Sequence, residues 1–119
     1  MKVVFTARGE TLDADLDSRF GRAAKFLVYD LDSEDVEVVD NQQNLNAPQG
    51  AGIQAAQTVV GLGASALVTG HCGPKAYRAL SAAGVTIYNT DAKTVAEALE
   101  RFRSGELTPA RSADVQGHW

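Results

Sequence analysis

The 119-residue sequence has one cysteine, no long apolar run and no excess of positive charge. A single cysteine cannot form an internal disulfide, and this composition suits a reducing compartment. The opening residues are interrupted by charge too soon for a secretory signal peptide, and no segment approaches the length that spans a bilayer. We therefore expect a cytoplasmic protein without a membrane partner. The net charge of −4 also argues against nucleic acid, because phosphate binding needs a clustered basic surface.

The apolar share of 45% is sufficient for one folded core, and its pattern alternates between strand and helix. Strands are predicted at Val3–Ala7, Phe26–Leu31, Val36–Asp40, Ala66–Thr69 and Val85–Tyr88. Helices are predicted from Gly50 to Gly61, from Pro74 to Ala83, and from a Thr94-x-x-Glu97 capping box to Gly105. The short link between the second and third strands predicts an antiparallel hairpin, and the strand–helix–strand steps predict parallel pairs. The expected fold is α/β, with a five-stranded mixed sheet, one antiparallel strand, and helices on its faces.

In such a sheet, ligands bind beyond the carboxyl ends of the parallel strands, where three loops should meet. These loops are residues 8–22, residues 41–52 and residues 70–73. Two of them lead directly into helices, and the free N–H groups at a helix N-terminus favour an anion.

The loop Gly70-His71-Cys72-Gly73-Pro74 carries the strongest signal of the three. Its glycines permit close approach of a ligand. Cys72 would lie beside a helix N-terminus, where a thiolate is stabilised, and His71 adds an imidazole; both are candidate metal ligands. An equally open alternative makes Cys72 a small core residue and His71 a helix cap.

The other two loops carry weaker signals. Gly50 and Gly52 begin a helix, but the third glycine of a nucleotide fingerprint is absent. Arg19 and Arg22 flank Phe20-Gly21, and they can face an anion or pair with the nearby aspartates. The aspartates themselves lack the ligand pattern of a calcium loop.

Cys72 followed by five residues and Arg78 also matches the pattern of cysteine-dependent phosphatases, in which a thiolate attacks phosphorus. Pro74 removes one N–H from the proposed cradle, and Arg78 would lie more than a turn inside the helix. This enzyme therefore stays a minority alternative, and a ligand-free interaction module is a third.

Several segments together carry a family resemblance: residues 20–23 (FGRA), 50–56 (GAGIQAA), 70–76 (GHCGPKA), 84–85 (GV) and 94–95 (TV). In their order and spacing they resemble the dinitrogenase iron–molybdenum cofactor-binding family, and most of all its small stand-alone, orange-protein-like members. The resemblance covers residues 1–107 as one domain and leaves residues 108–119, which show no periodicity, as an expected flexible tail.

The resemblance implies a ribonuclease H-like fold and a protein that is not an enzyme. Its implied role is to bind, carry or protect a preassembled molybdenum-containing sulfide cluster, of molybdenum–copper or iron–molybdenum type, in exchange with cluster-assembly or acceptor proteins. The cofactor-binding residues that it implies are Phe20, Gly21, Arg22, Asn46, Gly50, Ala51, Gly52, His71, Cys72 and Gly73. One cysteine and two histidines cannot supply the four thiolates of an ordinary iron–sulfur cluster. They suffice if an anionic cluster arrives with its own sulfides and is held mainly by N–H groups and arginines.

Overall fold

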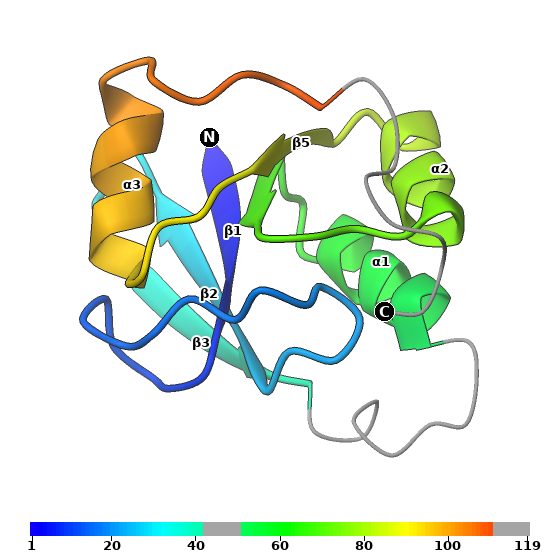
Figure 1. Cartoon of the computed structure of the whole chain (residues 1–119), viewed down its shortest axis with the longest axis horizontal. Coiled ribbons are helices and arrows are strands. Elements are labelled where there is room, and N and C mark those ends of the chain that lie inside the picture. Colours follow the sequence, from blue (N-terminus) through cyan, green and yellow to red (C-terminus); the bar gives the residue numbers. More distant parts are fainter. Residues whose placement is uncertain (42–50, 111–119) are drawn as a thin grey trace.

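The computed structural model of the chain describes residues 1–41 and 51–110, and it contains all the predicted elements (Figure 1). Their ends coincide with the predicted ones or differ from them by at most two residues. The elements in chain order are β1 (Lys2–Ala7), β2 (Lys25–Asp30), β3 (Val36–Asp40), α1 (Ala51–Gly61), β4 (Ala66–Thr69), α2 (Pro74–Ala82), β5 (Thr86–Asn89) and α3 (Val95–Arg103). No helix among the described residues is long and apolar enough to cross a membrane.

The strands form one five-stranded sheet in the order β3-β2-β1-β4-β5. β2 pairs antiparallel with both β1 and β3, whereas β1–β4 and β4–β5 are parallel pairs. The mixed sheet with a single antiparallel strand is therefore confirmed. The carboxyl ends of β1, β3, β4 and β5 lie at one edge of the sheet, where the sequence predicted that the loops after β1, β3 and β4 meet.

Helices cover both faces of the sheet. Side chains on successive residues of a strand point to opposite faces, so a strand that is apolar throughout needs a covering layer on each face. Val4 belongs to the core layer that α1 and α2 close, and its neighbours Val3 and Phe5 belong to the layer that α3 closes. All three side chains are fully buried. This explains why the central strands are apolar along their whole length.

The helix starts follow the predicted chemistry. Thr94 precedes α3, and its hydroxyl accepts a hydrogen bond from the Glu97 amide at 3.1 Å. The Glu97 carboxylate in turn accepts from the amide of Lys93 at 3.0 Å, one residue earlier than in the usual capping box. α2 begins with Pro74 directly after Gly73, with no side-chain cap.

The chain after α3 returns along β5 (Figure 1). Pro109 forms an isolated bridge with Tyr88, and the Ala110 amide donates to the Ile87 carbonyl at 2.7 Å. The Tyr77 hydroxyl donates to the Ala110 carbonyl at 3.1 Å. Residues 108–110 of the segment expected to be flexible are thus held at the β5 edge, and the rest of that segment lies outside the described residues.

Candidate functional site

A short segment, residues 16–20, crosses the carboxyl edge of the sheet between β1 and β4. On the β1 side, the Asp17 amide donates a hydrogen bond to the Thr6 carbonyl at 2.9 Å. On the β4 side, the His71 amide donates to the Ser18 carbonyl at 2.7 Å, and the Phe20 amide donates to the His71 carbonyl at 3.2 Å. The loops after β1 and β4 are therefore joined by backbone hydrogen bonds, which fixes the position of His71.

Gly70 is required by this junction. A Cβ atom at Gly70 would lie 2.7 Å from both the Cα and the carbonyl oxygen of Ser18, and real Cβ atoms essentially never come so close to other atoms. On the sequence pattern alone, this glycine is interpreted as permitting the close approach of a ligand. The structure instead places the protein's own backbone against it.

Polar groups beneath the junction are paired. Asp17, which is 2% exposed, accepts a hydrogen bond from the Arg19 amide at 3.1 Å, and its carboxylate lies 3.6 Å from the Arg19 Nε. The Thr6 hydroxyl donates to the Asp17 carbonyl at 2.6 Å and lies 2.8 Å from the Thr69 hydroxyl. Arg19 therefore follows the local-pairing alternative rather than the anion-facing one.

The predicted cofactor-binding residues fall into different environments. His71 is exposed, and Arg22 and Gly52 are half-buried. Asn46 and Gly50 lie outside the described residues, and Ala51 is the first residue of α1. The buried members are Phe20, Gly21, Cys72 and Gly73.

Phe20 and Cys72 belong to the core layer under α1 and α2. The Phe20 ring packs against the ring of Phe26 with centroids 5.9 Å apart, and it is 1% exposed. Cys72 is also 1% exposed, and its Sγ lies 3.7 Å from the Gly73 carbonyl oxygen. These side chains shape the loops from below, whereas His71 presents its ring at the surface.

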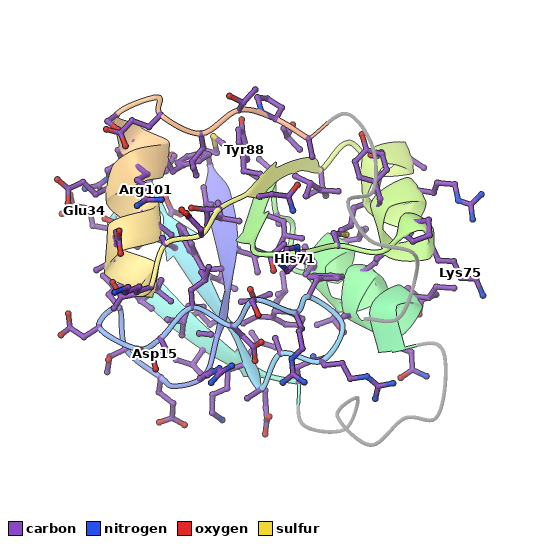
Figure 2. All side chains as sticks on the ribbon, in the orientation of Figure 1. Asp15, Glu34, His71, Lys75, Tyr88 and Arg101 are labelled. Atoms are coloured by element: carbon purple, nitrogen blue, oxygen red, sulfur yellow. The ribbon has the colours of Figure 1, made fainter. Side chains whose placement is uncertain are left out.

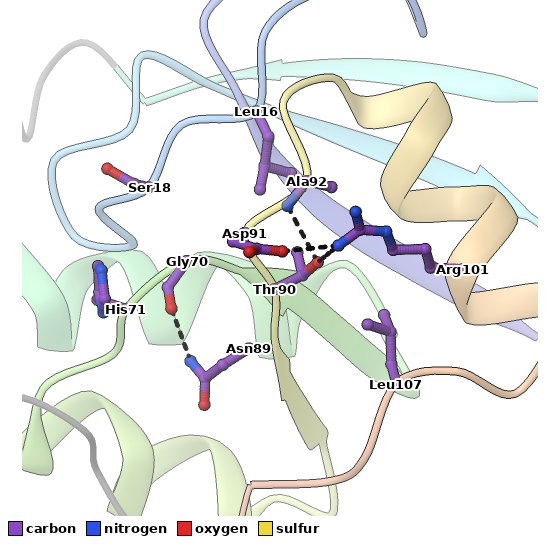
Figure 3. Close-up of a pocket in the computed structure, with 10 residues that line it drawn as sticks. All are labelled: Leu16, Ser18, Gly70, His71, Asn89, Thr90, Asp91, Ala92, Arg101 and Leu107. Carbon is purple, nitrogen blue, oxygen red and sulfur yellow. Dashed lines mark hydrogen bonds and ion pairs between the residues drawn. The ribbon is translucent and has the colours of Figure 1, made fainter.

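A cavity of about 610 Å³ opens beside His71 at the carboxyl ends of β4 and β5 (Figure 3). Its walls come from the segment 16–18, from Gly70 and His71, from residues 89–92, and from Arg101 of α3. A second cavity of about 330 Å³, which Arg8 and Lys93 line, shares part of this wall. Cationic side chains from three different segments therefore line this edge of the sheet, together with the carboxylates of Asp15 and Asp91.

The β5 side of the larger cavity is ordered by polar contacts. Asn89 donates from its side-chain amide to the Gly70 carbonyl at 3.0 Å. Arg101 donates to Asp91 at 2.7 Å and to Glu97 at 2.8 Å. The hydrogen bond from Arg101 holds the pKa of Asp91 below its usual range, and the same contact raises the pKa of Arg101.

Four residues that line the larger cavity were not predicted from the sequence: Asn89, Thr90, Asp91 and Arg101. A signal was present, because β5 was predicted to be parallel to β4 and its carboxyl end must reach the same edge. Residues 89–92 follow the fifth strand just as the three predicted loops follow the first, third and fourth strands, so their position at this edge was predictable.

The described part of the chain lacks a conventional set of metal-ligand side chains. Within residues 1–41 and 51–110, no group of three or more His, Cys, Asp or Glu side chains could hold a metal ion.

The geometry also disfavours the phosphatase alternative. Cys72 is buried in the core layer, whereas Arg78 is exposed on α2. The Tyr77 amide already donates to the Gly73 carbonyl at 2.9 Å, so the loop after Cys72 is committed to the first turn of the helix. A thiolate in this position cannot reach a phosphate ester without opening the core.

Comparison with known proteins gives consistent matches. The family model described as "Dinitrogenase iron-molybdenum cofactor" matches residues 1–105. The apo form of the orange protein from Desulfovibrio gigas is 41% identical, with a TM-score of 0.93 over 96% of both chains. A putative NifB protein from Thermotoga is 33% identical, with a TM-score of 0.85 over 98% of both chains. An uncharacterized protein of Methanocaldococcus jannaschii is 26% identical over 77% of this chain and 80% of its own length.

Proposed function

The chain belongs to the dinitrogenase iron-molybdenum cofactor family, and from that premise we propose that it binds a preassembled, anionic, molybdenum-containing sulfide cluster. Its role is to carry or protect the cluster rather than to catalyse a reaction. The observation that carries this proposal is the edge around His71, where Arg8, Lys93 and Arg101 line two cavities but the described residues offer no metal-ligand set of their own. Such an edge suits an anion whose metals are already coordinated by sulfide.

The cluster would sit at the carboxyl edge, with His71 as the exposed side chain between the larger cavity and the start of α2. The family resemblance implies that Arg22 and Gly52 also contact the cluster. We include Asn46, Gly50 and Ala51 in the proposed binding site on the same ground. Phe20, Gly21, Cys72 and Gly73 support the loops from the buried side. Direct ligation by Cys72 would require its thiol to turn out of the core.

Two finer assignments belong to the proposal. We favour a molybdenum–copper sulfide cluster over an iron–molybdenum type. The family resemblance associates the molybdenum–copper type with orange-protein-like members, and the match to the orange protein extends along 96% of both chains. We also assign the fold as ribonuclease H-like, which the strand order β3-β2-β1-β4-β5 with antiparallel β2 supports. Proteins that assemble or accept such clusters are the expected partners.

Anaerobic reconstitution tests the proposal. The full chain is mixed with tetrathiomolybdate, with and without copper(I), and passed through a gel-filtration column. We expect visible charge-transfer absorption to elute with the protein, and amide resonances of Ser18, Gly52 and His71 to shift. Absorption that separates from the protein in every mixture would contradict cluster binding.

A matched pair of variants locates the site. Arg8 and Lys2 are exposed cations at opposite ends of β1, and each loses one positive charge on replacement by glutamine. Arg8→Gln should weaken cluster binding by about twofold to fivefold, as expected for one exposed charge interaction. Lys2→Gln should leave the affinity unchanged. Equal effects of the two variants would place the cluster elsewhere.

A further inference from the structure

The two edge strands of the sheet, β3 and β5, differ in whether another part of the chain pairs with them. The β5 edge is covered by the chain itself, through the Tyr88–Pro109 bridge and the hydrogen bond from Ala110 to Ile87. β3 forms the other edge, and no described strand pairs with its outer side. Val36 and Val38 of β3 are each 40% exposed. An edge strand that exposes apolar side chains is a template for pairing with another chain.

The backbone of β3 is oriented for such pairing. The Asp35 carbonyl accepts from the Asp30 amide at 3.0 Å, and the Asn41 amide donates to the Ala24 carbonyl at 2.9 Å. Because antiparallel strands alternate between residues that bond to the neighbour and residues that do not, the N–H and C=O groups of Val36 and Val38 point away from β2. Those groups face the position that a sixth strand would take.

The exposed valines extend an existing apolar layer. Val36 lies opposite Tyr29, and Val38 lies opposite Leu27, so all four side chains are on one face of the sheet. Tyr29 and Leu27 are buried members of the layer under α3. An added strand would place its own side chains against Val36 and Val38 and enlarge this layer.

The charge beside β3 determines which strand fits. Residues 30–40 include six carboxylates and no lysine or arginine: Asp30, Asp32, Glu34, Asp35, Glu37 and Asp40. Within the described ranges, ion pairs join three of them to cations: Asp32 to the N-terminal amine, Glu34 to Arg103, and Asp40 to Lys25. Figure 2 shows Glu34 at the margin of the molecule beside α3. A second copy of this chain would bring like charges together, whereas a basic segment would be attracted.

We propose that β3 is a docking edge for an extended, lysine- or arginine-rich segment of a partner protein. The segment adds to the sheet as a sixth strand, covers Val36 and Val38, and places its cations against the acidic hairpin. Because β3 runs in the same direction as β1, the docked segment would extend from the hairpin to the edge that carries His71. This inference does not depend on the identity of the cluster, and its test uses protein without one.

The probe is a short blocked peptide in which lysine and valine alternate, added to the full ¹⁵N-labelled chain. We expect amide shifts confined to β3 and β2, and an affinity that falls as salt is added. A peptide in which glutamate and valine alternate should cause no shifts. Shifts of equal size with both peptides, or shifts confined to other parts of the chain, would overturn the proposal.

Three variants test the docking geometry. Val38→Pro removes an N–H that points away from β2, so the fold should persist while peptide binding is lost. Glu37→Lys should weaken binding by about threefold to tenfold, because it reverses one cross-strand charge. Glu106→Lys makes the same charge change in the exposed segment that returns from α3 along β5, and it should leave the peptide affinity unchanged. A folded Val38→Pro variant that binds as tightly as the wild type, or a concentration-dependent dimer through β3, would refute the assignment.

Discussion

Gly70→Ala is the most informative perturbation of the junction that positions His71. The added Cβ would lie 2.7 Å from the Cα and the carbonyl oxygen of Ser18 and 2.9 Å from its Cβ. Contacts below 3.0 Å essentially never occur and ordinary contact begins at 3.4 Å, so the two segments must separate by at least about 0.3 Å, and by about 0.7 Å for unstrained contact. The atoms that must move are mainly backbone, and one of them accepts the 2.7 Å hydrogen bond from the His71 amide.

The expected cost combines overpacking with a weakened hydrogen bond. These terms sum to about 2–4 kcal/mol of unfolding free energy. For a chain of this length, the corresponding fall in Tm is on the order of 10 °C. The loss of unfolding free energy should arise at the junction between Ser18 and Gly70. The amide resonances of Ser18 and His71 should therefore shift more than those of α3.

Urea unfolding followed by circular dichroism measures the effect, with Gly61→Ala as the matched control. Gly61 ends α1, has no atom within 4 Å of an added Cβ, and does not have a positive φ. The control should therefore be neutral or more stable by up to about 1 kcal/mol. If Gly70→Ala unfolds within about 0.5 kcal/mol of the wild type, the close approach of Ser18 does not explain this glycine.

Three further predictions concern the same edge. The Cys72 thiol, which is 1% exposed, should react with Ellman's reagent only when the protein unfolds, and rapid reaction in the native state would contradict its burial. His71→Ala should weaken cluster binding several-fold yet change the unfolding free energy by less than about 0.5 kcal/mol, because the side chain is exposed; a large loss of stability would give His71 a structural role instead. Asp91 has a lowered pKa through its hydrogen bond from Arg101, so its contribution to stability is present above the ordinary value of 3.8 and is lost as pH falls through the lowered value. Urea midpoints of Asp91→Asn and wild type should therefore converge on acidification, and a widening gap would reverse the assigned sign.

The sequence predicted the fold in detail because its signals were local and mutually consistent. Thr94 and Glu97 form the cap that the spacing indicated, and Pro74 begins α2. The link between β2 and β3 was too short for any connection but a hairpin. The strand order β3-β2-β1-β4-β5 was not predicted, because a right-handed crossover does not by itself determine on which side of the hairpin β4 and β5 are added.

The site was less predictable, because its contacts join residues that are distant in the sequence. The pairing of Ser18 with Gly70 and His71 involves two loops, and no periodic pattern records it. Burial of Phe20 and Cys72 likewise depends on which side of each loop faces the α1 and α2 layer. The contribution of Arg101 comes from α3, which lies on the other face of the sheet from α1 and α2, so only the assembled fold brings it to the cavity that His71 also lines.

Metal and sulfide analysis of the protein purified anaerobically from its native cells tests the central claim most directly. The proposed function predicts that molybdenum and acid-labile sulfide accompany the protein in a constant ratio through successive columns. Release of both on mild acid treatment should leave a folded chain that binds tetrathiomolybdate again. A preparation that contains neither element at any stage, and a purified chain that takes up no cluster, would contradict the account.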